Sequence, residues 1–267
     1  MSANFIRRYF RTQCLQHYAK QIPNNLKAKS KSSQEWLTRQ LADPYVQKAK
    51  MLNYRCRSAF KLLEINEKYK ILKPGDVVVD IGAAPGSWTQ IAVESTNSHG
   101  ANEKQPRGAV ISMDLQYFHE VKVCVEGATI FGGMDFTKPA SQLLLKQTLA
   151  GRPVNCVLSD MAPNATGVRI LDQECIMNLC YAAFHFAMNI STKGGILVMK
   201  VWDNGDVHKL EKELLRFYDK VKRVKPNSSR SVSSEHFLVA RDFKGVDEII
   251  KRTSREAKNN TLETEKY

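Results

Sequence analysis

The stretch Val77-Val-Val-Asp-Ile-Gly-Ala-Ala-Pro-Gly-Ser-Trp-Thr-Gln90 combines a short apolar run, a turn of small residues and a polar helix start. Such a run is typical of a strand buried in a parallel sheet. Gly82 and Gly86 would let the backbone approach a ligand closely. The stretch therefore predicts a strand, a cofactor-binding turn and a helix. A nicotinamide dinucleotide is disfavoured, because the turn lacks the third glycine of the dinucleotide fingerprint.

Length and composition suit one α/β domain with extensions and a polyanionic partner. The chain has 267 residues, 43% of them hydrophobic, and a formal net charge of +13. Residues 1–34 hold seven basic residues and no acid, which leaves 33 basic against 27 acidic residues elsewhere. Six cysteines without a C-x-x-C pair and six histidines without ligand spacing indicate a reduced compartment and no metal site. No apolar run is long enough to predict a membrane span.

The first 34 residues have the composition of an organellar targeting leader followed by a linker. Arginines alternate there with large apolar side chains, as in transit peptides. A basic arm that contacts RNA directly is the alternative, but such arms are more often lysine blocks. We therefore expect a mitochondrial leader and linker over 1–34, one folded domain over 35–243 and a charged tail over 244–267.

Beyond the leader, strand patterns alternate with helix patterns. Strands are expected at 77–81, 108–114, 128–131, 154–159, 196–202, 220–225 and 235–241. Helices are expected from Pro44 with Asp43 as cap, over 55–69 with Ser58 as cap, from Ser87, and over 141–150, 173–190 and 207–218. This order predicts a doubly wound sheet, mostly parallel and covered by helices on both faces, whose ligands bind at the carboxyl ends of the strands.

Four aspartates lie at or near those carboxyl ends: Asp80, Asp114, Asp135 and Asp160. A carboxylate at the end of the second strand, Asp114, suits ribose hydroxyls. Asp135 and Phe136 would offer a purine a hydrogen bond and an apolar wall. We therefore expect a cofactor that contains adenosine.

Four further positions alternate in charge along the chain: Lys61, Asp160, Lys200 and Glu235. Lys200 is the single charge in an apolar strand, so it needs a partner, and Asp160 on the neighbouring strand is the obvious one. The four residues could form a catalytic site or an ion-pair network that only braces the sheet. The residue pattern alone leaves both interpretations open.

Several motifs carry a family resemblance over about residues 40–243. They are Asp80–Trp88, the Leu158-Ser-Asp-Met-Ala-Pro-Asn164 segment with Gly167, Val198-Met-Lys-Val201, and Lys225-Pro-Asn-Ser-Ser-Arg230 through Glu235. In this order and spacing they resemble the FtsJ/RrmJ family of ribosomal RNA ribose 2′-O-methyltransferases. Two departures are Ser87, where the family commonly has glycine, and Phe237, where bacterial relatives are expected to have tyrosine.

The resemblance implies a Rossmann-like methyltransferase domain that uses S-adenosylmethionine. It implies a catalytic tetrad of Lys61, Asp160, Lys200 and Glu235, and a cofactor pocket of Gly82, Ala83, Ala84, Pro85, Gly86, Trp88, Asp114, Asp135, Phe136 and Asp160. Lys200 would be the general base for a ribose hydroxyl. Burial and the charge of Lys61 are expected to favour its neutral amine, while Asp160 and Glu235 orient the two amines.

With the leader, the resemblance implies a monomeric enzyme of the mitochondrial matrix that methylates ribosomal RNA in a large-subunit precursor, at a uridine. Arg55, Arg57, Ser229 and Arg230 are candidate RNA contacts, although a solvated basic face is equally compatible with them. Trp202 would stack on the substrate or belong to the core. Two other functions stay open: a ribosome-assembly factor with dispensable methyl transfer, and a tRNA or cap ribose methyltransferase.

Overall fold

The computed structural model describes residues 34, 38, 40–116, 125–164, 166–203 and 206–247. The chain divides into two compact units, Met1–Asn53 and Tyr54–Tyr267. In the first unit, α3 (Pro44–Met51) begins after Asp43, whose carboxylate accepts a hydrogen bond from the Tyr45 amide at 3.0 Å. The expected cap at Asp43 is therefore confirmed. The second unit begins at Tyr54, and the domain bounds 35–243 stay a prediction.

The second unit is built on one seven-stranded sheet in the order β3-β2-β1-β4-β5-β7-β6. The strands are β1 (Val77–Ile81), β2 (Ala109–Met113), β3 (Ala128–Phe131), β4 (Val154–Ser159), β5 (Ser191–Trp202), β6 (Tyr218–Val224) and β7 (Glu235–Phe243). The first five strands run parallel, whereas β7 pairs antiparallel with β5 and with β6. The predicted mostly parallel α/β sheet is confirmed.

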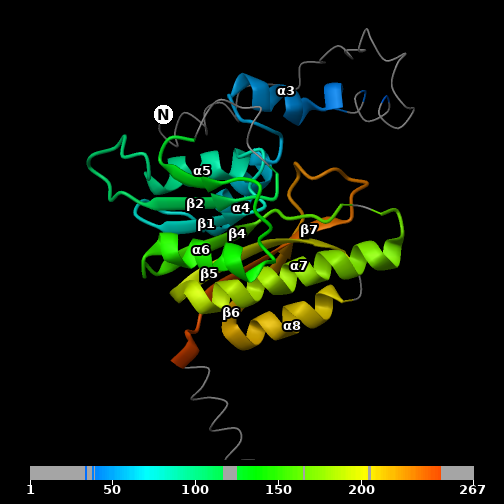
Figure 1. The fold of residues 1–267 in the computed structure, drawn as a ribbon. Coiled ribbons are helices and arrows are strands. Elements are labelled where there is room, and N and C mark those ends of the chain that lie inside the picture. Colours follow the sequence, from blue (N-terminus) through cyan, green and yellow to red (C-terminus); the bar gives the residue numbers. More distant parts are fainter. Residues whose placement is uncertain are drawn as a thin grey trace, which may run out of the picture. The chain divides into compact units, whose positions relative to one another are not determined.

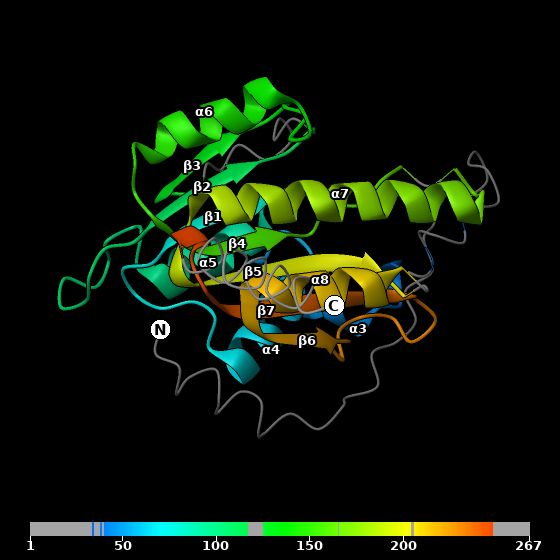
Figure 2. The same cartoon turned by 90° about the horizontal axis from the view of Figure 1, so that it is seen from below.

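Helices cover both faces of this sheet, as Figure 1 shows. On one face, α4 (Ala59–Tyr69) and α5 (Ser87–Thr96) bury Leu62, Ile65 and Trp88 against apolar side chains of the strands. On the other face lie α6 (Pro139–Leu149), α7 (Arg169–Ile190) and α8 (Val207–Phe217). Figure 2 shows the long α7 running beside β4 and β5. Two cores therefore hold the sheet rigidly between them.

Three helix starts differ from the sequence-based expectation. Helix α4 begins at Ala59 rather than at 55, and the side chain of the preceding Ser58 makes no capping hydrogen bond. Helix α6 begins at Pro139 rather than at 141, since proline is favoured in a first turn. Helix α7 begins at Arg169 rather than at 173; Ile170 is 75% exposed, so the first turn has no buried face that periodicity would reveal.

Candidate active site

The turn after β1 is held against the end of β2. The amides of Gly82 and Ala83 both donate to the Met113 carbonyl, at 2.9 and 3.2 Å. Gly82 has φ +75°, and a Cβ there would lie 2.7 Å from Met161 Cγ and 2.8 Å from its backbone nitrogen. Protein atoms therefore fill the side of Gly82 that the sequence suggested was left open for a ligand. This glycine is required by the backbone conformation and by packing against the end of β4.

Carboxylates follow β2 and β3 at the same edge. Asp114 accepts hydrogen bonds from the amides of Ala84 at 2.8 Å and Gln116 at 2.6 Å. Asp135 accepts from the Thr137 hydroxyl and amide, and these bonds lower the pKa of its carboxyl despite slight burial. Asp135 is therefore anchored by its own local turn, and Asp114 is anchored both locally and by the turn after β1. A carboxylate has about four acceptor sites, so each can still accept hydrogen bonds from a ligand.

Trp88 and Phe136, two expected members of the cofactor pocket, are largely buried. The Trp88 ring is packed 5.5 Å from the ring of Phe237, and its Nε1–H donates to the Ser58 carbonyl at 3.0 Å. Phe136 is 4% exposed and meets Phe186 edge to face. Little of either ring is left as a wall for a purine. Their part in cofactor binding stays a prediction, and their observed part is to fix the walls behind the turn.

Asp80, at the end of β1, is completely buried. Its Oδ2 accepts a hydrogen bond from the Thr89 hydroxyl at 2.7 Å, whereas its Oδ1 has no hydrogen-bond partner among the described residues. Burial raises the pKa of Asp80 to about 7; the Thr89 bond opposes this shift, and the charges of Asp160 and Asp114 add to it. The pKa of this carboxyl is therefore shifted upward, whereas the pKa of Asp135 at the same edge is shifted downward.

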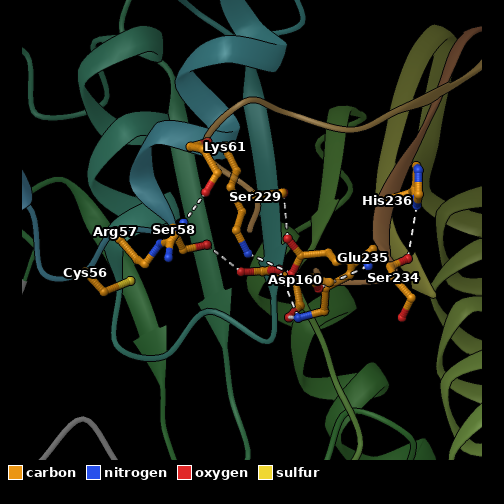
Figure 3. A network of polar contacts seen from close by, with 12 residues as sticks. Cys56, Arg57, Ser58, Lys61, Asp160, Ser229, Ser234, Glu235 and His236 are labelled. Atoms are coloured by element: carbon orange, nitrogen blue, oxygen red, sulfur yellow. Dashed lines mark hydrogen bonds and ion pairs between the residues drawn. The ribbon is translucent and has the colours of Figure 1, made fainter. Parts of the chain in front are cut away.

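The tetrad residues form two ion pairs. Figure 3 labels three of the four, Lys61, Asp160 and Glu235. Lys61 Nζ lies 2.7 Å from Glu235 Oε2, and Lys200 Nζ lies 3.0 Å from Asp160 Oδ1. Lys200 Nζ also donates to the Asp160 carbonyl at 2.6 Å. The four side chains are only 9% to 17% exposed. The expected pairing of Lys200 with Asp160 is confirmed, while Lys61 has Glu235 as its carboxylate partner.

Asp160 is held in its charged form. Burial by itself would raise the pKa of this carboxyl, but the charges of Lys200 and Lys61 and the hydrogen bonds from Ser58 and Lys200 outweigh burial, so its pKa lies below the ordinary value. The Ser58 hydroxyl donates to Asp160 Oδ2 at 2.7 Å. Ser58 was expected to cap α4, but its hydroxyl binds the Asp160 carboxylate instead.

A second carboxylate on α4 supports the loop before β7. Glu64 accepts hydrogen bonds from the amides of Asn227 at 2.6 Å and Ser228 at 3.0 Å. The next residue, Ser229, donates its hydroxyl to Glu235 Oε1 at 2.8 Å. Ser58, Lys61 and Glu64 are spaced three apart, so one side of α4 contacts three distant segments. Sequence reasoning missed Ser58 and Glu64 as site residues, because their partners are 102 to 164 positions away.

Arg55, Arg57 and Ser229, which are candidate RNA contacts, bind partners inside the protein. Arg55 Nη1 donates to the Pro85 carbonyl at 2.9 Å, Arg57 donates to the Ser228 carbonyl, and Ser229 binds Glu235. These bonds tie the cofactor turn and the loop before β7 to the segment that leads into α4. Arg230 is only partly buried. RNA binding by these residues stays a prediction, and a structural role is observed for the first three.

The sequence predicts neither a metal site nor a membrane span. Among the described residues, no group of three or more histidines, cysteines or acids is placed to hold a metal ion. In the same part of the chain, no helix combines the length and apolarity that crossing a membrane requires. Cys56, Cys156, Cys175 and Cys180 are free thiols.

Comparison with known proteins gives close relatives along most of the chain. It is 65% identical over 240 residues to a Drosophila melanogaster protein named mitochondrial rRNA methyltransferase 2, covering 90% of this chain and 94% of that relative. It is 43% identical over 219 residues to ribosomal RNA large subunit methyltransferase E of Cereibacter sphaeroides, covering 82% and 87% of the two chains.

A solved Plasmodium falciparum structure described as a ribosomal RNA methyltransferase superposes with a TM-score of 0.61 at 26% identity, covering 72% of this chain and 100% of that one. The family match extends over residues 54–243 and includes the sheet, the glycine turn and both ion pairs. The chain therefore belongs to the FtsJ-like methyltransferase family.

Proposed function

We propose that this protein transfers a methyl group from S-adenosylmethionine to a ribose 2′-hydroxyl of ribosomal RNA, at a uridine of the mitochondrial large subunit. The observation that carries the proposal is the double ion pair of Lys200 with Asp160 and Lys61 with Glu235, beside a glycine turn at the carboxyl edge of the sheet. The names of the Drosophila and Cereibacter relatives support the class of substrate.

The residues at this edge fit S-adenosylmethionine, which supplies an electrophilic methyl group on a sulfonium cation. Asp114 and Asp135 are acceptors suited to ribose hydroxyls and to an adenine amino group. The first amides of α5, which follow Gly86, suit a carboxylate because a helix N-terminus favours anions. The turn 82–86, Trp88, Phe136 and Asp160 complete the proposed binding site.

Lys200 would accept the proton of the ribose hydroxyl. A neutral amine has two hydrogens and one lone pair; Lys200 Nζ donates one hydrogen to the Asp160 carbonyl at 2.6 Å and lies 3.0 Å from Asp160 Oδ1. The amine can therefore keep both contacts and present its lone pair to the hydroxyl. Asp160 fixes the direction of this lone pair, which is the geometric requirement for general-base catalysis.

Lys61 and Glu235 would position the ribose and compensate charge. Their contact at 2.7 Å leaves one ammonium and one carboxylate paired beside the base. The charge of Lys61 also acts on Asp160 and helps to lower the pKa of that carboxyl. An ionised Asp160 can then compensate the positive charge that develops when Lys200 takes up the proton.

Lys200→Ala tests this assignment. Because general-base catalysis contributes about 10²- to 10⁴-fold, single-turnover methyl transfer from labelled S-adenosylmethionine should fall by at least that range. Calorimetric binding of S-adenosylmethionine should be nearly unchanged. Lys209→Ala is the matched control, since Lys209 is exposed on α8 and pairs with Asp206. Transfer at the wild-type rate by the Lys200 variant would refute the assignment.

The location and the target can be tested in cells. The acid-free, arginine-rich residues 1–34 support a mitochondrial location, and we place the enzyme in the matrix as a monomer that acts on a large-subunit precursor. Removing residues 1–34 should abolish mitochondrial import. Depletion should erase one ribose methylation from mitochondrial large-subunit RNA, and an unchanged methylation map would redirect the search to other RNAs.

A further inference from the structure

A cavity of about 390 Å³ lies beside the tetrad, at the carboxyl edge of β5. The start of α7 contributes Arg169, Asp172 and Gln173 to its lining, and the end of β5 contributes Trp202 and Asp203, with Ser234 before β7. Its volume lies in the range typical of small-molecule sites. None of these side chains belongs to the tetrad or to the proposed cofactor site.

The cavity is joined to the tetrad through two neighbouring strands. Trp202 lies two residues after Lys200 on β5, which corresponds to about 6.6 Å along a strand. It is paired with Glu235 in the ladder between β5 and β7. The Asp203 amide donates to the Ser234 carbonyl at 2.8 Å, which closes the base of the cavity next to Glu235. When a ribose lies at Lys200, its own base or the base of the next nucleotide can therefore reach the cavity.

The lining chemistry suits a nucleobase better than a phosphate. The lining holds one arginine and two aspartates, so it has no excess of positive charge that would attract a phosphate. Asp203 is fixed by Arg223 Nη1 at 2.6 Å and can accept further hydrogen bonds. Gln173 offers both a donor and an acceptor, which matches the alternating groups on a base edge. Trp202, only partly buried, offers an aromatic ring for stacking.

The walls of the cavity are held in place without a ligand. Asp172 accepts hydrogen bonds from the Thr166 amide and hydroxyl, both at 2.7 Å, and from the Gly167 amide at 3.2 Å. The loop before α7 is therefore tied to the first turn of that helix. A wall that is already ordered reduces the entropic cost of binding.

We propose that this cavity receives one nucleobase of the RNA strand whose ribose lies at Lys200, stacked on Trp202, with its polar edge toward Gln173 and Asp203. The proposal rests on the proposed function and adds the site that selects the position of the strand. Stacking of a base on an aromatic side chain is sequence-tolerant, whereas its polar edge is read by hydrogen bonds.

The test is a double-mutant cycle that combines protein variants with RNA variants. Short uridine-rich oligonucleotides are prepared with one abasic nucleotide at successive positions, and their affinity for the full-length protein is measured by fluorescence anisotropy. Trp202→Leu removes the ring, Trp202→Phe restores an aromatic face, and Lys209→Ala is the control on exposed α8. Gln173→Ala is a second variant that tests the cavity without altering the core.

For the wild-type protein, one abasic position should weaken binding about tenfold. Trp202→Leu should lower the affinity for intact RNA by a similar factor, and an abasic nucleotide at that same position should then lower it no further. Trp202→Phe should recover most of the lost affinity. Gln173→Ala should show the same insensitivity in part. If the abasic nucleotide weakens binding by the same factor in both protein variants as in the wild type, the proposal is wrong. It is also wrong if no abasic position weakens binding by the wild-type protein.

The proposed function is judged separately. Methyl transfer to ribosomal RNA by the same wild-type preparation is measured in parallel, and its failure would count against the function and not against the cavity. If the affinities show the expected dependence between protein and RNA variants but no methyl group is transferred, the proposed base site stands. If a methyl group is transferred but the affinities show no such dependence, the proposed base site is wrong.

Discussion

Replacing Asp80 with asparagine should change how the stability of the protein depends on pH. The carboxyl is fully buried at the end of β1, and burial raises its pKa to about 7. An unfolded aspartate has a pKa of about 3.9. The folded state therefore binds more protons than the unfolded state between about pH 4 and pH 7, and the free energy of unfolding falls as the pH rises through this window.

The magnitude follows from the shift in pKa. A difference of about three units corresponds to about 4 kcal/mol, since one unit is about 1.4 kcal/mol. Asparagine cannot ionise, and its amide oxygen can still accept the hydrogen bond from Thr89. Its NH2 group would replace Oδ1, which has no hydrogen-bond partner among the described residues, at a cost of about 1–3 kcal/mol that does not vary with pH.

Urea unfolding of both proteins from pH 4.5 to 8.5 measures this effect. The stability of Asp80→Asn relative to the wild type should rise by several kcal/mol across the range, with most of the rise below pH 7. Asp135→Asn is the control, because the pKa of that largely exposed carboxyl is lowered and its contribution should be constant above pH 4.5. Parallel stability curves for Asp80→Asn and the wild type would refute the account of a buried, destabilised charge.

Two further substitutions test the turn and the loop before β7. Gly82→Ala should lower the free energy of unfolding by about 3 kcal/mol or more. Gly151 has a similar φ of +77° but open space around it, so Gly151→Ala should cost only about 1–2 kcal/mol in the same urea titration. Glu64→Gln keeps one acceptor oxygen for two amide donors, so it should cost about 1–2 kcal/mol. It should also slow single-turnover methyl transfer several-fold while S-adenosylmethionine binding stays constant; an unchanged rate would show that the loop does not depend on this carboxylate.

The sheet was predictable because apolar runs and strand-end acids follow simple rules. A lysine in an otherwise apolar strand requires a neighbouring anion, and this physical need identified Asp160 as the partner of Lys200 before any coordinates. Parallel strands bring their carboxyl ends to one edge, which placed Asp114 and Asp160 together. These inferences succeed because each depends on the pattern of single strands and on their shared direction in the sheet.

Side-chain partners across long separations were not predictable. Ser58 has the residue type of a helix cap and stands where a cap would stand, yet its hydroxyl contacts Asp160 instead. Glu64 looks like an ordinary surface carboxylate on an amphipathic helix, although it binds two amides of a loop more than 160 residues later. Trp88 was placed in the cofactor pocket, but a sequence motif does not tell whether a ring or a backbone amide faces a ligand.

The two ion pairs of the tetrad differ in what holds them. Lys200 and Asp160 lie on and directly after adjacent strands of the sheet, so the β4–β5 ladder sets their distance. Lys61 and Glu235 join α4 to β7, so their distance depends on how α4 packs on the sheet. Any change that shifts α4 would therefore disturb the positioning pair and the bond from Ser58 to Asp160, while the β4–β5 ladder still sets the register of Lys200 and Asp160. The amine that we assign as the base lies on a central strand of the sheet, whereas the position of the pair that we assign to the ribose depends on the packing of one helix.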